Sequence, residues 1–147
     1  MNKSLLFLVS ASFALSSVHV AAEVTWTGAV SNVWDTGVTA NFSDAGGAPV
    51  CFVSGNDVTF DDTPGSNQSV DVSGEIAVGN ITFSNSRYSY LLKPLSGAAL
   101  TGSGKLIVNG GEVTLGVPNR LSGGTLLNSG RLKLAGVSSV PAFGKSV

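Results

Sequence analysis

The sequence is poor in the residues from which most active sites are built. After the first 22 residues it has no histidine, and its one cysteine is Cys51. Without histidine, residues 23–147 cannot form a Ser-His-Asp triad or a Cys-His pair. A zinc site would lack its usual nitrogen and sulfur ligands, and a lone cysteine cannot close an intramolecular disulfide. We therefore expect no cofactor, no metal site and no enzymatic activity.

Charge is equally scarce. Charged residues make up 12% of the chain and the formal net charge is −1, whereas about 25% is usual. Binding to nucleic acid or to an anionic membrane requires clustered lysine and arginine, so neither partner is expected. With 43% hydrophobic residues and 19 glycines, the composition is that of a folded, glycine-punctuated chain rather than a disordered one.

Helical periodicity is also missing after residue 22, because Gly, Pro, Asn or Asp interrupts the chain every dozen residues or sooner. Short runs rich in Val, Ile, Thr and Phe recur instead, and these indicate strands. The expected strands are residues 24–26, 50–53, 58–60, 69–72, 76–78, 81–83, 88–92, 106–108, 113–115, 125–127 and 132–134. Strands this short are typical of a β-sandwich or of a solenoid.

The N-terminus has the three parts of a signal peptide. Lys3 supplies the positive charge, Leu5 to Leu15 form the apolar run, and Val20-Ala21-Ala22 is a small-residue cleavage end. The apolar run is shorter than the ~20 residues that span a bilayer, so cleavage before Glu23 is favoured over an uncleaved anchor. Residues 1–22 therefore predict export by the Sec machinery.

A weak repeat in the last third favours the solenoid over the β-sandwich. Residues 102–109 align with residues 122–128, and 111–115 align with 130–134, each about 20 residues apart, a period typical of solenoids. In this alignment Leu106 matches Leu126. Asn109 and Asn128 fall at the corner between two strands, where Asn tolerates the left-handed conformation and can hydrogen-bond locally.

The repeat divides the mature chain into two parts. Residues 97–147 are expected to form β-helix repeats, ending as a truncated copy. Residues 23–96 lack the period and are expected to form an irregular cap with the first coils, because a solenoid must shield its terminal core. Within this part, the Gly-, Asp- and Thr-rich segment Asn32 to Pro49 is expected to be an exposed loop.

The segment Leu121-Ser122-Gly123-Gly124-Thr125 and the alternating leucines up to Leu134 resemble the autotransporter-associated β-strand repeat, also called the passenger-associated transport repeat. Pro141-Ala142-Phe143-Gly144 is similar to the loop that precedes the next strand in that family. Upstream, Trp26-Thr27-Gly28, residues 32–36 and residues 55–61 resemble the segments that often precede such repeats.

The resemblance implies a right-handed parallel β-helix from the passenger of a type five secreted protein. It also implies a cell-surface or extracellular location associated with the outer membrane, or a periplasmic one if secretion is incomplete. Such passengers normally end in a transmembrane β-barrel, and this sequence lacks the alternating strands that a barrel needs. A structural, surface-display role is the leading interpretation. The alternatives are an adhesin for glycans or a host surface and, less favoured, a polysaccharide-acting enzyme.

Three acids form the candidate catalytic or calcium cluster: Asp57, Asp61 and Asp62. On a strand, Asp57 and Asp61 would share one face, with Asp62 at the next turn. Paired carboxylates can support glycoside hydrolysis or bind calcium. The favoured interpretation is simpler: residues 61–65 form a solvated turn whose acids accept backbone hydrogen bonds.

Four aromatic residues are the candidate sugar-binding platform: Trp26, Trp34, Tyr88 and Tyr90. Tyr88 and Tyr90 would share a strand face. Packing in the core or cap is the favoured interpretation for so few aromatic residues.

Overall fold

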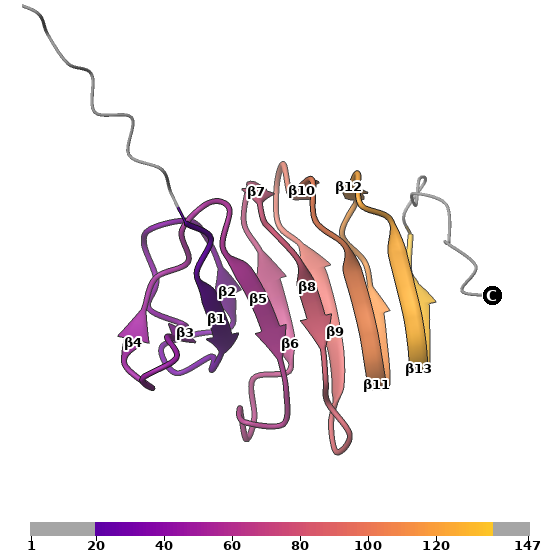
Figure 1. The fold of residues 1–147 in the computed structure, drawn as a ribbon, viewed down its shortest axis with the longest axis horizontal. Coiled ribbons are helices and arrows are strands. Elements are labelled where there is room, and N and C mark those ends of the chain that lie inside the picture. Colours follow the sequence, from indigo (N-terminus) through magenta and orange to yellow (C-terminus); the bar gives the residue numbers. More distant parts are fainter. Residues whose placement is uncertain (1–19, 137–147) are drawn as a thin grey trace, which may run out of the picture.

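The computed structural model describes residues 20–136, and every element in this part of the chain is a β-strand. The strands wind into a β-solenoid whose coils stack in parallel along one axis (Figure 1). The expected all-β parallel β-helix is thus confirmed, and the β-sandwich alternative is wrong. None of the described residues belongs to a helix that could cross a membrane.

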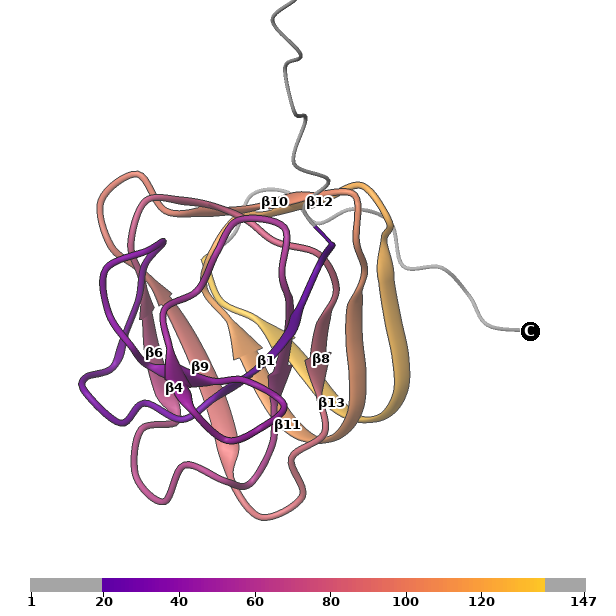
Figure 2. The same cartoon turned by 60° about the vertical axis from the view of Figure 1, so that its left-hand side comes forward.

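Each coil has three faces, which enclose the core when the solenoid is viewed from nearer its N-terminal end (Figure 2). The first face stacks β1 (Glu23–Trp26), β5 (Asp57–Phe60), β8 (Ile81–Phe83), and the first parts of β11 (Leu106–Leu115) and β13 (Thr125–Leu134). All these pairs are parallel, as expected for successive coils of one solenoid.

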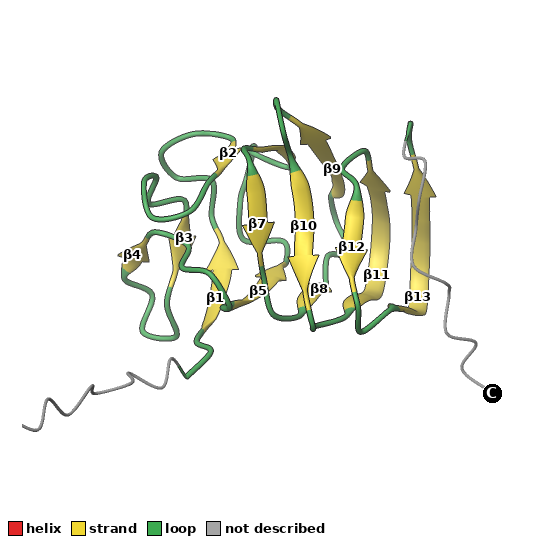
Figure 3. Cartoon of the chain, turned by 90° about the horizontal axis from the view of Figure 1, so that it is seen from above, coloured by secondary structure: helices red, strands yellow, loops and turns green. Residues whose placement is uncertain are grey.

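The second face stacks β2 (Val33–Trp34), β6 (Ser69–Val72), β9 (Ser89–Pro94) and the second parts of β11 and β13. The third face holds β7 (Glu75–Ala77), β10 (Ala99–Gly102) and β12 (Asn119–Leu121), which lie side by side in Figure 3. Because β11 pairs with β8 before its corner and with β9 after it, the first two faces form one continuous sheet.

Alternation of side chains along each strand builds the core. In β5 and β6 every second residue is buried, which is the period-two pattern of a strand with one face inward. Parallel register then stacks like residues on like: Phe60 pairs with Phe83, and Phe83 pairs with Val108. The outward residues stack in the same way, so that Thr25, Thr59 and Thr82 are in register.

An aromatic plug closes the N-terminal end of the core. The strands β3 (Phe42–Ser43) and β4 (Pro49–Val50) break the parallel pattern, since β3 pairs antiparallel with both β1 and β4. Phe42 and Phe52 are buried and pack against Trp34, with ring centroids 5.8 and 5.4 Å from it. The expected strand at 50–53 therefore ends at Val50, and Phe52 turns into the core instead.

The register of the last two coils differs by one residue from the alignment in the sequence. Leu106 pairs with Thr125 rather than with Leu126, so Thr125 faces the core and Leu126 faces outward. A register shift after Val108 absorbs the extra residue at the corner. A one-residue slip within a strand would turn every following side chain to the other face. Because the shift occurs at the corner instead, Leu127 stays in register with Val108.

Candidate functional site

The three candidate acids do not converge. Asp57 begins β5, whereas Asp61 and Asp62 follow its last residue, Phe60. Four residues of extended chain span about 13 Å, whereas paired carboxylates in glycoside hydrolysis lie roughly 5–10 Å apart. The cluster is therefore split between the two ends of one strand, and Asp61 lies just beyond the last residue of that strand.

Asp57 takes part in a ladder of hydrogen bonds between successive coils. Its Oδ1 accepts a hydrogen bond from the backbone N–H of Asn80 at 2.6 Å. In the next coil, the Asn80 Oδ1 accepts one from the N–H of Lys105 at 3.0 Å. The Asp57 carboxylate thus satisfies a backbone donor at the corner that leads into the first face, which is a structural role.

Asp62 is held by the loop between β8 and β9. Its carboxylate accepts hydrogen bonds from the Ser86 hydroxyl at 2.7 Å and from the backbone N–H groups of Ser86, Arg87 and Tyr88 at 2.9–3.3 Å. Hydrogen bonds to the charged form favour it. The pKa of Asp62 is therefore below its ordinary value of 3.8, chiefly because of the Ser86 hydroxyl.

We expect Asp62→Asn to lower the melting temperature at pH 7, because an amide replaces the carboxylate that accepts these bonds. The folded-state pKa is lower than the unfolded one, so the carboxylate's contribution is complete above about pH 4. It is lost as the pH falls through the folded-state value. Thermal melts from pH 7 to pH 2 should show the variant and parent converging in acid.

The matched control is Glu75→Gln, which neutralises an exposed acid on β7 for which the described structure shows no hydrogen-bond or ion-pair partner. It should melt close to the parent at every pH. A loss for Glu75→Gln as large as that for Asp62→Asn would contradict a specific role of the Asp62 contacts.

Asp61 caps its own turn: its Oδ1 accepts the N–H of Thr63 at 2.8 Å. Its backbone carbonyl accepts the Tyr90 hydroxyl at 2.7 Å. The favoured interpretation of residues 61–65 as an acid-capped turn is consistent with this geometry, although the chief partners of Asp62 come from the following coil rather than from the turn itself.

Three of the four candidate platform aromatics are core residues. Trp26 and Trp34 are 0% exposed and Tyr90 is 1% exposed. The pKa of the Tyr90 hydroxyl is raised above its ordinary value, and burial is the main cause. Tyr88 precedes β9 and is half-buried, with the Arg87 guanidinium 5.8 Å from its ring centroid. The pair Tyr88 and Tyr90 therefore does not form an exposed surface for stacking sugars.

The segment from Asn32 to Pro49 is only partly an exposed loop, which corrects the sequence expectation. Val38 is 77% exposed, but Trp34, Asn41 and Phe42 are buried. The Asn41 side chain accepts the N–H groups of Val30 and Ser31, both at 2.9 Å, and donates to the carbonyl of Val33 at 2.7 Å. These bonds fold the segment inward as part of the plug.

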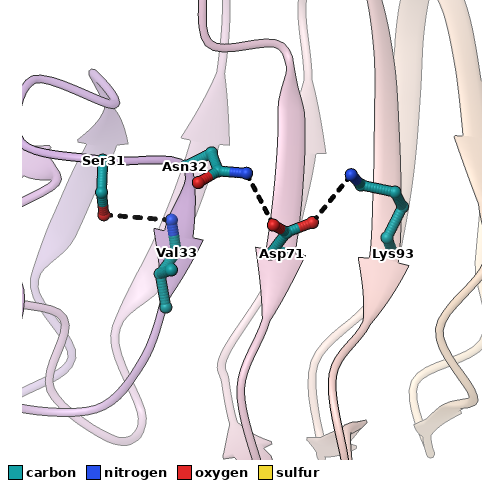
Figure 4. A network of polar contacts seen from close by, with 5 residues as sticks. All are labelled: Ser31, Asn32, Val33, Asp71 and Lys93. Atoms are coloured by element: carbon teal, nitrogen blue, oxygen red, sulfur yellow. Dashed lines mark hydrogen bonds and ion pairs between the residues drawn. The ribbon is translucent and has the colours of Figure 1, made fainter.

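A charged and amide ladder crosses the outside of the second face. The Asn32 amide donates to Asp71 at 2.6 Å, and Lys93 lies 3.0 Å from the other oxygen of the same carboxylate (Figure 4). Ser31 accepts the N–H of Val33 in the same network. These contacts link three consecutive coils, and the polar side chains involved bind one another.

The corner asparagines also link coils. The Asn128 amide donates to the Asn109 Oδ1 at 2.7 Å, as expected for hydrogen bonding at this corner, but between coils rather than locally. The expected left-handed conformation is wrong for both, because only glycines have positive φ among the described residues. Gly111 and Gly130, at +63° and +82°, take that role.

Glycines at the corner before the first face were not singled out from the sequence. A Cβ at Gly104 would lie 2.0 Å from the carbonyl oxygen of Gly79, and one at Gly123 would lie 2.4 Å from that of Gly104. The signal was present: a glycine stands two residues before the first inward residue in 79–81, 104–106 and 123–125. This spacing marks where the backbones of adjacent coils touch.

Within residues 20–136, no group of three or more His, Cys, Asp or Glu side chains could hold a metal ion. Of the candidate residues, Asp57 and Asp62 link successive coils, whereas Trp26, Trp34 and Tyr90 fill the core. Comparison with known proteins adds no assignment: no family model, no curated protein and no solved structure matches the chain.

Proposed function

We propose that the chain is a non-catalytic structural segment of an exported, autotransporter-like protein, displayed at the cell surface as part of its passenger. The observation that carries the proposal is the start of the solenoid. β1 begins at Glu23, the residue that follows the predicted cleavage site, and the plug of Phe42 and Phe52 closes that end of the core. A protein cleaved after Ala22 would therefore start with β1 in place and with the N-terminal end of its core covered by the plug.

The use of the polar side chains supports a structural role over a catalytic one. Asp57 and Asp62 accept backbone hydrogen bonds from the following coil. Asp71 accepts a hydrogen bond from Asn32, just before β2, and forms an ion pair with Lys93 of β9. Each of these carboxylates has a structural task in linking neighbouring coils, which supports the structural role.

The adhesin alternative would use either the aromatic rings or the Asn32–Pro49 loop. Among the four candidate rings only Tyr88 is more than marginally exposed, so the rings give this alternative little support.

The proposal implies two partners that act one after the other. The Sec machinery would recognise residues 1–22, an outer-membrane β-barrel would deliver the passenger to the surface, and the coils would then fold outside or, if secretion stalls, in the periplasm. A glycan or host-surface ligand belongs to the adhesin alternative.

Processing at Ala22 tests the first step. In a Gram-negative host, the full chain is expected to yield an exported product whose intact mass begins at Glu23. Ala22→Arg should block cleavage, since the residue before the cut must be small. Ala21→Arg is the matched control and should be processed, because the adjacent position is less constrained. Retention of residues 1–22 in all three proteins would contradict the proposal.

A further inference from the structure

The sequence contains one Asn-Gly pair, Asn109-Gly110. In such a pair the backbone nitrogen of the second residue can attack the side-chain amide carbon of the first and close a cyclic imide. A side chain on the second residue obstructs this attack, whereas glycine has none and lets its backbone approach another group closely. The pair lies within β11, at the corner between the first two faces of the solenoid. The local sequence thus permits imide formation at this corner.

The backbone at this corner interrupts the regular ladder between β11 and β13. The register shifts on both sides of Asn109, and neither Gly110 nor Gly111 has a partner in register there. Gly111 has a φ of +63°, in the left-handed region. Asn109 itself is exposed, although the next coil already lies beside it. Water and base can therefore reach its amide, and the attacking nitrogen belongs to a residue outside the regular pairing.

The contacts of the Asn109 side chain favour attack on its amide. Its Oδ1 accepts a hydrogen bond from the Asn128 amide of the next coil at 2.7 Å. When a nitrogen attacks the amide carbon, negative charge develops on this oxygen, and a donor aimed at it stabilises the transition state. Among residues 20–136, none accepts a hydrogen bond from the Asn109 Nδ2, which is the group that must leave.

The other corner asparagines lack this combination. Asn85 is 0% exposed, and its amide donates to the carbonyl of Tyr88. Asn128 is followed by Ser129, whose side chain obstructs the attack. The Asn128 amide is also the donor in its contact with Asn109, so its own carbonyl gains nothing from that bond. Asn109 is therefore the corner asparagine whose contacts and neighbour both favour the reaction.

We propose that Asn109 is a modification site, where the amide converts without an enzyme to aspartate and isoaspartate while the Asn128 amide stabilises the attacked oxygen. The Gly110 nitrogen bonds to the Asn109 Cγ and gives its proton to solvent base. The Cγ–Nδ2 bond breaks, and the amide nitrogen takes up a proton and leaves as ammonia. One water molecule then opens the imide: opening at the side-chain carbonyl gives aspartate, and opening at the backbone carbonyl gives isoaspartate.

The two products affect the corner differently. Aspartate keeps an oxygen that accepts the Asn128 amide, so the contact between coils is retained. Isoaspartate adds one carbon to the main chain where the coils are closely packed. A Cβ at Gly110 would lie 2.9 Å from the Asn85 carbonyl oxygen, and one at Gly111 would lie 2.1 Å from the Asn85 amide nitrogen. The isoaspartate form should therefore have a lower melting temperature than the parent.

Peptide mass spectrometry of the purified full chain measures the conversion. After incubation of the folded protein in mildly alkaline buffer, the amide-to-acid mass change should appear first at residue 109, in two isomeric peptides. Asn85 and Asn128 should still be amides at that time. Asn109→Gln is the control and should show no early product, because its longer side chain must close a larger ring. An Asn109 that stays intact in the folded chain while other asparagines convert would overturn the proposal.

Asn128→Ala separates the effect of the fold from that of the local sequence. Loss of the donor should slow conversion at Asn109 by about 2- to 10-fold, the effect of one hydrogen bond. If Asn128 only restrained the side chain, the same variant would speed the reaction. Ser129→Ala is the matched control: it removes a hydrogen bond from the Ser129 hydroxyl to the Asn109 backbone carbonyl, which is not the group attacked. This control should not slow the conversion.

In concentrated urea, the parent and Asn128→Ala should convert at the same rate, because unfolding removes the contact between coils. Equal or faster conversion in folded Asn128→Ala would overturn the proposal, as would equal slowing in Ser129→Ala or a difference that persists in urea. Export is measured on cells and this conversion on purified protein, so the two proposals fail independently.

Discussion

Phe60→Ala is expected to lower the free energy of unfolding by about 3–5 kcal/mol, the usual cost of deleting a fully buried ring. Phe60 is 0% exposed, and its ring centroid lies 4.7 Å from that of Phe83 and 5.1 Å from that of Tyr90. Trp26 and Trp34 lie 6.0 and 5.6 Å away on the other side. The substitution therefore opens a cavity where the plug meets the regular coils.

Urea denaturation of the parent protein and of Phe60→Ala would measure this loss of unfolding free energy. Phe60→Leu retains most of the volume and should cost only about 1–2 kcal/mol, and Thr82→Ala, on the outside of the next coil, should cost within about 0.5 kcal/mol. Equal losses for Phe60→Ala and Thr82→Ala would show that the ring does not occupy the core.

Gly104→Ala is expected to destabilise the protein by about 3 kcal/mol, at the upper end of the cost of overpacking. The added methyl group would lie 2.0 Å from the carbonyl oxygen of Gly79 and 2.2 Å from its carbon. Both contacts are with backbone, which cannot swing aside like a flexible side chain. The two coils must separate at this corner, and their hydrogen bonds along the first face must lengthen.

The matched control is Gly65→Ala, since a Cβ at Gly65 meets nothing within 4 Å and its φ lies outside the left-handed region. This variant should be neutral or slightly stabilised, because alanine restricts the unfolded chain. Thermal or urea unfolding of both variants decides the matter. If Gly104→Ala unfolds like Gly65→Ala, the coils do not touch at this corner.

The alternation of apolar residues was enough to predict most strands of the first two faces. In residues 58–60, 69–72 and 81–83, apolar and polar side chains alternate cleanly, because one side of each strand is buried in the core and the other faces outward. The third face is harder to recognise. β12 has Asn119 at a buried position, and β10 begins with two buried residues in succession, so neither shows the expected period.

The plug could not be predicted from local pattern. β2 and β3 are two residues each, and Asn41 folds them inward through bonds to Val30, Ser31 and Val33. Polar, glycine-rich segments usually lie on the surface. This segment is partly buried instead, because Trp34, Phe42 and the Asn41 amide cover the end of the core, which would otherwise be exposed.

The candidate acids show the same division between local and tertiary information. The turn at Asp61 follows from its neighbours in sequence, and its bond to Thr63 is local. The contacts of Asp62 with Ser86 depend on the stacking of two coils. A pattern in one segment does not contain that information, so the role of Asp62 emerged only from the fold.

Surface exposure on the cells that make this protein tests the central proposal most directly. Intact and lysed cells would be treated with protease and immunoblotted with an antibody against residues 23–136. We predict an antigen far larger than the 14.8 kDa of this chain, lost from intact cells on digestion because it belongs to a displayed passenger. An antigen of the size of this chain alone, or one protected inside intact cells with residues 1–22 still attached, would contradict the proposal.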